Sequence, residues 1–160
     1  MSSYLAVIYG TSPANNPVAW QLARSLPGKS AVLSLDQLLA GAIAQPSEDA
    51  TAELDMAHTQ LRLLVANYMR NGYNVVVEGV FYHERGGQTY RYEQDVDQLV
   101  SLMRNMTRKA LTVHLRDPEA AAHFEYRTRY GVNALNFDST TSVEEIAEAL
   151  LQRLLAEEIT

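Results

Sequence analysis

The sequence contains no cysteine among its 160 residues. Disulfide bonds, thiolate metal ligands and cysteine nucleophiles are therefore excluded, and the composition fits a reducing compartment. Positive charge is also scarce, because 13 Lys and Arg stand against 19 Asp and Glu, which gives a formal net charge of -6. Binding along a nucleic-acid backbone relies on clustered Lys and Arg. We therefore expect no nucleic-acid partner.

Long apolar runs are missing as well. No uninterrupted apolar stretch approaches the roughly 18 residues of a membrane-spanning helix, and the chain enters a candidate strand without a cationic lead. We expect a cytoplasmic protein with no membrane partner. A chain of this length buries a core large enough to need no covalent staple, which predicts a single domain over residues 1–160.

Most residues of a phosphate-binding loop are missing from the place where such a loop would stand. The apolar run 4–9 predicts a strand, Gly10 ends it, and a helical pattern follows. Against the pattern G-x-x-x-x-G-K-[ST], the segment keeps Gly10 but has Asn15, Asn16 and Pro17 where glycine, lysine and hydroxyl belong. The lysine for the terminal phosphates and the hydroxyl for magnesium are therefore absent.

A purely structural interpretation explains the same residues. Asn16 as the N-cap and Pro17 as the first helical residue make a favoured helix start. The N-terminus of that helix could still bind a single anion weakly through its dipole.

Short β-branched runs alternate with amphipathic helical patterns along the chain. The unbroken apolar run 75–77 indicates a strand buried on both faces, as in a parallel sheet covered by helices. Short connections between the elements favour an α/β fold, whose ligands bind at the carboxyl ends of the strands. We expect further strands at 31–35, 74–78 and 110–115, helices at 18–26, 36–43, 54–69, 96–106, 117–130 and 142–157, and a short extended piece at 134–137.

The ordered set of these motifs resembles the small P-loop kinases. It is most similar to the zeta-toxin-like and chloramphenicol-phosphotransferase-like branch, and the likeness spans nearly the whole chain. The resemblance implies a three-layer α/β sandwich with a five-stranded parallel sheet. It implies a truncated lid too, because only eight residues separate Arg129 from Asp138. The motifs are Tyr4 to Gly10, Ser34-Leu35-Asp36, Gly72 to Gly79, Leu115 to Arg129, and Phe137 to Thr140 with the terminal helix.

The resemblance implies four catalytic candidates. Asp36 matches the acid that activates the acceptor hydroxyl, Glu78 a position near magnesium and acceptor, and Arg127 and Arg129 the arginines that neutralise the phosphates. The residues themselves leave alternatives open. Asp36 could cap the helix that it opens, Glu78 could pair with an arginine, and the two arginines could lie on a solvated helix face.

A second candidate region is the polar, aromatic loop from Phe81 to Glu93. It is longer than ordinary α/β connections and lies where the family binds its acceptor, although it could equally be a surface segment. His58 lies on an apolar helical stripe with no second ligand at metal spacing, so we expect a core histidine and no metal site. The predicted ligand-binding residues are Gly10, Thr11, Ser12, Asn15, Asn16, Tyr82, His83, Arg85 and Arg91.

Three functions remain open on the sequence alone. The losses in the phosphate loop and lid favour a degenerate kinase homologue that binds a small-molecule or nucleotide-like ligand, or regulates, without a certain cofactor. The second is an active kinase that uses ATP and Mg²⁺ on a small-molecule or nucleotide hydroxyl, with its cation supplied by Lys29, Arg127 or Arg129. The third is a protein-interaction module that acts through an exposed tyrosine-rich surface, with a homodimer as one form of such an interaction.

Overall fold

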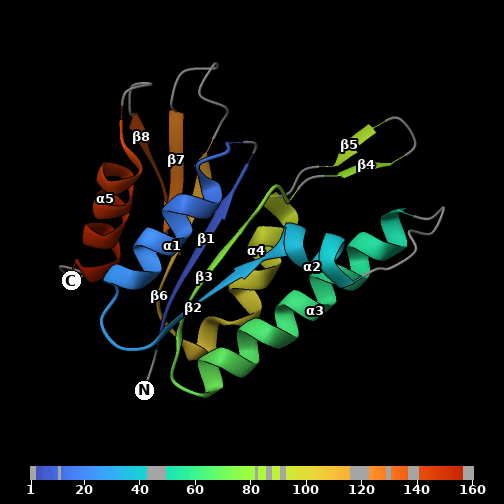
Figure 1. Ribbon diagram of the computed structural model, residues 1–160, viewed down its shortest axis with the longest axis horizontal. Coiled ribbons are helices and arrows are strands. Elements are labelled where there is room, and N and C mark those ends of the chain that lie inside the picture. Colours follow the sequence, from blue (N-terminus) through green and yellow to red (C-terminus); the bar gives the residue numbers. More distant parts are fainter. Residues whose placement is uncertain are drawn as a thin grey trace.

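The computed structural model describes residues 3–10, 12–42, 50–81, 83–85, 88–90, 93–115, 123–128, 131–136 and 141–156. These residues form an α/β fold around a six-stranded sheet with the order β2-β3-β1-β6-β7-β8 (Figure 1). A separate two-stranded antiparallel sheet pairs β4 with β5. The strands are β1 (Ser3–Tyr9), β2 (Ser30–Ser34), β3 (Asn74–Gly79), β4 (His83–Arg85), β5 (Gln88–Tyr90), β6 (Thr107–Leu115), β7 (His123–Thr128) and β8 (Gly131–Asn136).

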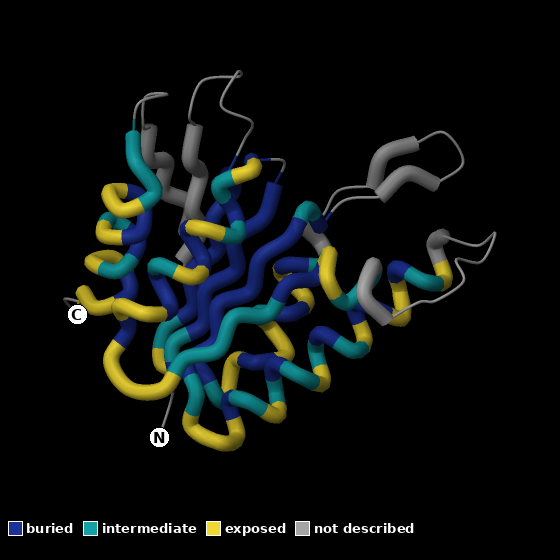
Figure 2. Tube along the Cα trace, in the orientation of Figure 1, coloured by how far each residue is buried: buried dark blue, intermediate teal, exposed yellow. Residues whose placement is uncertain are grey.

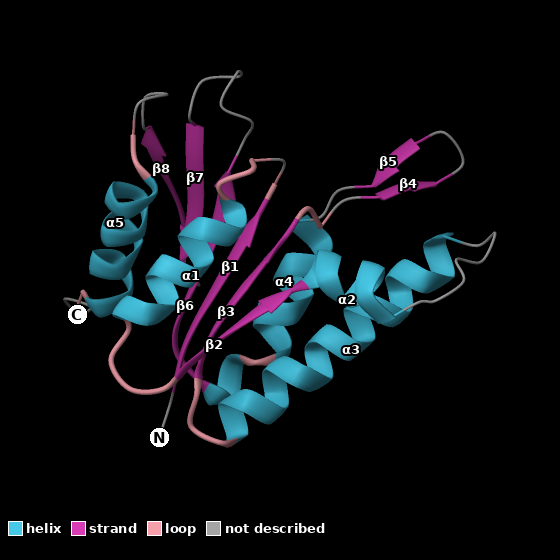
Figure 3. Ribbon diagram, in the orientation of Figure 1, coloured by secondary structure: helices cyan, strands magenta, loops and turns pink. Residues whose placement is uncertain are grey.

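Helices cover both faces of the sheet (Figures 1 and 3). One face packs against α1 and α5, and the other against α2, α3 and α4. No helix in the described part of the chain combines the length and the apolar character needed to cross a membrane. The helices are α1 (Asn15–Ser25), α2 (Leu35–Ala42), α3 (Ala50–Arg70), α4 (Glu93–Leu102) and α5 (Val143–Leu155), and a 3-10 turn η1 spans Arg104–Met106.

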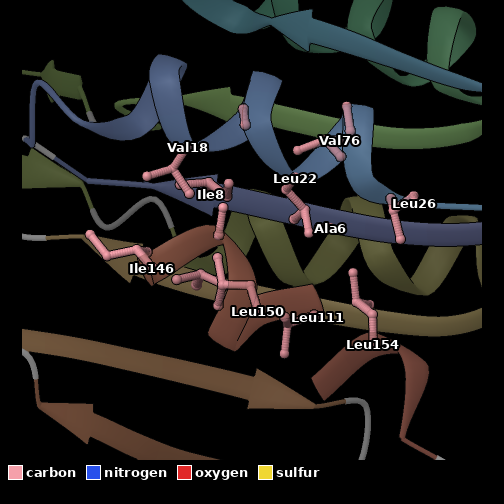
Figure 4. Close-up of a cluster of buried hydrophobic side chains, with 14 of the residues drawn as sticks. Ala6, Ile8, Val18, Leu22, Leu26, Val76, Leu111, Ile146, Leu150 and Leu154 are labelled. Carbon is pink, nitrogen blue, oxygen red and sulfur yellow. The ribbon is translucent and has the colours of Figure 1, made fainter. Parts of the chain in front are cut away.

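Two apolar cores lie on the two faces of the sheet. In the first, alternate residues of the central strands pack against α1 and α5. Ile8 of β1, Leu22 of α1 and Leu150 of α5 belong to this core (Figure 4). In the second, the intervening strand residues, such as Val7, meet α3 and α4. Figure 2 shows the central strands as the most buried part of the molecule. Glu78 follows Val76 by two positions and therefore faces the α1 side.

Several helix predictions are confirmed. The apolar stripe of α3 is buried as expected, and Gly72, with a φ of +82°, follows the end of that helix. Ser142 is the N-cap of α5, since its hydroxyl accepts a hydrogen bond from the N–H of Glu145 at 3.1 Å. The end of the helix expected at Ile43 lies outside the described residues.

The expected sheet of five parallel strands is wrong. Four strands, β2, β3, β1 and β6, are parallel, whereas β7 and β8 continue the sheet as antiparallel strands. The helix expected over 117–130 is also wrong where the structure describes it, because 123–128 is β7. In β7, Phe124 and Tyr126 alternate with Glu125 and Arg127, and this period of two fits a strand. The extended piece expected at 134–137 falls largely within β8.

Asn74 joins three segments at the amino end of the sheet. Its Oδ1 accepts a hydrogen bond from the N–H of Tyr4 at 3.0 Å, and its Nδ2 donates to the carbonyl oxygen of Pro27 at 2.8 Å. The N–H of Asn74 donates to the carbonyl oxygen of Lys29 at 2.8 Å. One buried side chain thus aligns the starts of β1, β2 and β3.

Gly10 holds the carboxyl ends of three strands together. Its N–H donates to the carbonyl oxygen of Gly79 at 3.2 Å, and its φ is +123°. A Cβ atom at this position would overlap the carbonyl oxygen of Leu115 and lie 2.7 Å from Cδ2 of His114. Only glycine fits here, for reasons of both conformation and space.

We expect Gly10→Ala to destabilise the protein by about 3 kcal/mol, because it combines a strained backbone with a clash in the packed sheet. Gly28→Ala is the matched control. Gly28 also has a positive φ, +88°, but no atom lies within 4 Å of a Cβ built there, so about 1 kcal/mol should be lost. Urea unfolding of both variants measures the difference. Equal losses would show that the close contact at Gly10 does not contribute to the free energy of unfolding.

Candidate functional site

The connections that follow β1 and β3 leave the carboxyl edge of the sheet on opposite faces. The two strands are parallel neighbours. β1 leads into α1 on one face, whereas the connection after β3 leads to α4 on the other face. Ligands of parallel sheets bind at such switch points. The loop 10–16 and the segment 78–81 therefore form the candidate site.

The turn between β1 and α1 uses its own hydrogen-bond donors. The N–H of Ser12 donates to the carbonyl oxygen of Leu115 at 3.3 Å, and the N–H of Asn15 donates to the carbonyl oxygen of Ser12 at 3.3 Å. The N–H of Ala14 donates to the hydroxyl of Ser12 at 3.1 Å. Three peptide donors that a phosphate would need are thus engaged within the protein.

The side chain of Asn15 lies inside this turn. Its Nδ2 donates to the carbonyl oxygen of Gly10 at 2.9 Å, and the residue is 5% exposed. Its Oδ1 is buried and has no hydrogen-bond partner among the described residues. A glycine at this position would leave that volume empty, so Asn15 fills space that the motif of a phosphate loop keeps open.

Asn16 connects α1 to the end of β3. Its Nδ2 donates to Oε1 of Glu78 at 3.3 Å. The predicted N-cap role of Asn16 is wrong, because α1 begins at Asn15 and its N-cap position is Ala14, which makes no side-chain cap. Ser12 performs part of that work instead, since it accepts the N–H groups of Ala14 and Asn15.

Glu78 is a buried carboxylate, 5% exposed. The alternative prediction paired it with an arginine. Among the described side chains, no arginine, lysine or histidine forms an ion pair with Glu78. Its hydrogen-bond partner is the neutral amide of Asn16. The negative charge of Glu78 is therefore balanced by no cation within the described part of the chain.

Asp36 is not the N-cap of α2. Ser34 has that role, because its hydroxyl accepts a hydrogen bond from the N–H of Gln37 at 3.3 Å. Burial of its carboxyl group raises the pKa of Asp36, and a hydrogen bond from the N–H of Val80 opposes that rise. Asp36 as a whole residue is exposed, so solvent screening keeps the effect on stability small. The carboxylate nevertheless lies beside the end of β3.

The other face of the same edge carries aromatic and imidazole groups, of which Tyr9 and His114 were not singled out from the sequence. The rings of Tyr9 and His114 are stacked, with centroids 5.1 Å apart. Phe81 is buried with a φ of 61°, which is rare for an aromatic residue. Its ring contacts that of His58, whose Nε2 lies 3.8 Å from Oδ2 of Asp95.

His58 is buried on α3, as predicted. Within the residues that the structure describes, no group of three His, Cys, Asp or Glu side chains could hold a metal ion. The strand-end positions of Tyr9 and His114, which are paired in register, are the signal that could have identified this cluster.

Two other predicted residues, Arg127 and Lys29, start from positions away from the site, and the structure describes the rest only in part or not at all. Arg127 lies on β7 opposite Thr112, three register positions before Leu115, which is roughly 10 Å from the carboxyl edge. Lys29 precedes β2 at the amino edge, where its Nζ lies 4.7 Å from the ring centroid of Tyr73. His83 and Arg85 belong to β4, of which only the backbone is described. Thr11, Tyr82, Arg91 and Arg129 lie outside the described residues.

No protein-family model matches the chain, and no curated protein sequence matches it either. The function of the site must therefore follow from its own residues and their geometry.

Two substitutions distinguish the roles of Ser34 and Asp36. Ser34→Ala removes the N-cap of α2 and should cost about 1 kcal/mol. Asp36→Asn should leave the free energy of unfolding at pH 7 unchanged or slightly higher, because it removes a charge that burial disfavours. Urea unfolding at pH 3 and pH 7 measures both effects.

The pH dependence follows from the direction of the shift. A carboxyl whose folded pKa is raised binds more protons in the folded state, so the wild type loses stability as the pH rises from 3.8 through the folded pKa. Asp36→Asn lacks this loss, and its advantage over the wild type should grow from pH 3 to pH 7. A loss at pH 7 as large as that of Ser34→Ala would contradict this assignment.

Proposed function

We propose that this protein is a degenerate kinase homologue that acts as a ligand-binding or regulatory module and does not transfer phosphate from ATP. The observation that supports this most directly is the position of Asn15. Its buried side chain donates to the carbonyl oxygen of Gly10 at 2.9 Å and occupies the interior of the β1–α1 turn.

Hydrogen bonding within the turn works against phosphate binding. The N–H groups of Ser12, Ala14 and Asn15 already donate to protein acceptors, and Pro13 and Pro17 have no N–H to offer. A phosphate would have to replace these bonds, each worth about 1 kcal/mol. Three backbone donors of the turn are therefore not free to bind a phosphate.

Charge works in the same direction. Phosphoryl transfer relies mainly on positioning and on positive charge around the phosphates. The described part of the candidate site instead presents the carboxylate of Glu78, held by the amide of Asn16 at the position where a phosphate loop has lysine. A buried carboxylate repels an approaching triphosphate.

The frame of a kinase-like domain supports the rest of the proposal. The turn has the length of a phosphate loop, since α1 begins at Asn15, the position of the second glycine. The strands on either side of the site are parallel and carry helices on both faces. The β7–β8 hairpin stands where the resemblance implies an arginine-bearing helix, so support for the frame comes from the four parallel strands alone.

An active kinase is the second candidate, and Asp36 is the observation that favours it. A carboxylate with a raised pKa beside a strand end suits a general base for an acceptor hydroxyl. Such an enzyme would need a cation for the phosphates from outside the described residues, because Lys29 lies at the opposite edge of the sheet.

Restoring the loop tests the proposal. The wild type should show no change in melting temperature with ATP and Mg²⁺. The double variant Asn15→Gly/Asn16→Lys should bind Mg²⁺-ATP, because it opens the turn and adds the missing cation. Ligand at 100 times its Kd adds about 2.7 kcal/mol, or roughly 5 to 10 °C for a chain of this size.

Asn15→Gly/Asn16→Gln is the matched control, since it opens the same turn without adding charge, and it should bind nucleotide more weakly than the lysine variant. Phosphate, ADP and GTP run alongside ATP. A saturable Mg²⁺-dependent shift with ATP in the wild type would overturn the proposal and restore the kinase.

A further inference from the structure

A buried amide oxygen at the start of α1 lacks a hydrogen-bond donor, and a buried carboxylate at the end of β3 lacks a cation among the described residues. Oδ1 of Asn15 has no partner, although its residue is 5% exposed. Glu78 is equally buried and has no cation among the described residues. An unpaired buried charge is strongly disfavoured, and a buried acceptor without a donor costs the free energy of its lost hydration.

The two acceptors belong to one small region. The amide of Asn16, the residue after Asn15, donates to Glu78 at 3.3 Å. On the other side of the turn, Gly10 accepts from Asn15 and donates to Gly79, the residue after Glu78. These bonds connect the turn to the end of β3 at two points, which places both acceptors at the switch point between β1 and β3.

We infer that this switch point between β1 and β3 binds the primary ammonium group of a small molecule. The inference rests on the proposed function, because it gives the ligand of a module whose phosphate loop is closed. An ammonium group carries three N–H donors and one positive charge. Its charge suits the carboxylate of Glu78, and its N–H donors suit an amide oxygen without a partner, such as Oδ1 of Asn15. The site therefore favours a cation, whereas a phosphate loop favours an anion.

Asn16 selects an ammonium group over a guanidinium group. It already donates to Oε1 of Glu78, so a planar guanidinium cannot take both carboxylate oxygens in the paired arrangement that it prefers. A compact ammonium group needs only one of them. A metal ion fits less well, because calcium and magnesium take six or more oxygen ligands and the described residues contain no group of three ligating side chains.

Thermal shift and calorimetry with simple amines test the inference. The probes are butylammonium and 1,4-diaminobutane at pH 7, where both are protonated. Tetramethylammonium at the same ionic strength is the control, since it has the charge but no N–H donor. We expect the two probes to raise the melting temperature in a saturable way and tetramethylammonium to leave it unchanged.

Glu78→Gln is the decisive variant, because it keeps the shape of the side chain and the acceptor for Asn16 but removes the charge. It should weaken binding of butylammonium about tenfold or more. Glu148→Gln removes an equal charge from the exposed face of α5 and should bind as the wild type does. Without ligand, Glu78→Gln should melt at a higher temperature than the wild type, since no unpaired charge remains buried.

Different results overturn different conclusions. If neither probe shifts the wild type, or if Glu78→Gln binds them equally well, the ammonium site is wrong. The proposed function survives that result as long as Mg²⁺-ATP also fails to bind. If Mg²⁺-ATP binds the wild type, the proposed function fails whatever the amines do. A lower melting temperature for ligand-free Glu78→Gln would show that a cation already pairs with Glu78, which also overturns the site.

Discussion

The backbone of Gly10 passes so close to the end of β6 that no side chain fits between them. This contact fixes the direction in which the chain leaves β1, and the geometry of the site follows from it. Ser12 is held against Leu115, α1 starts at Asn15, and that residue faces inward. The next residue, Asn16, then reaches Glu78 on the neighbouring strand. A sheet edge packed this tightly leaves the turn few alternative paths.

The sequence predicted the parallel part of the fold because its signals are local. The apolar runs of β1 and β3 and the stripe of α3 can be recognised within one element. The helix expected over 117–130 failed because apolar and polar residues alternate in 123–128 with the period of two that suits a strand. The N-cap of α2 was assigned two residues late, to Asp36 in place of Ser34, since both types are good caps. Helix boundaries are the least certain feature of such predictions.

Site residues were recognised individually, but their relations were not. Glu78 and Asn16 are 62 positions apart, and no periodicity within an element reports that contact. The orphaned oxygen of Asn15 depends on which way its amide is turned, and the carbonyl of Gly10 determines that orientation because it accepts only from Nδ2. The missing lysine was evident from the sequence. The proposed preference of the site for a cation over an anion could not be predicted from this segment alone, because it depends on Glu78 of the neighbouring strand.

Most contacts that hold the sheet together are made by the backbone, or by a side chain at the opposite edge from the candidate site. Asn74 aligns the amino ends of three strands and the backbone of Gly10 closes the carboxyl edge, while Asn15 and Asn16 each attach the turn to that edge through one side-chain hydrogen bond. Substitutions at the two asparagines can therefore change the class of ligand that binds while the protein remains folded. Evolution could exchange an anion-binding turn for a cation-binding one in a few steps, with every intermediate still a folded protein.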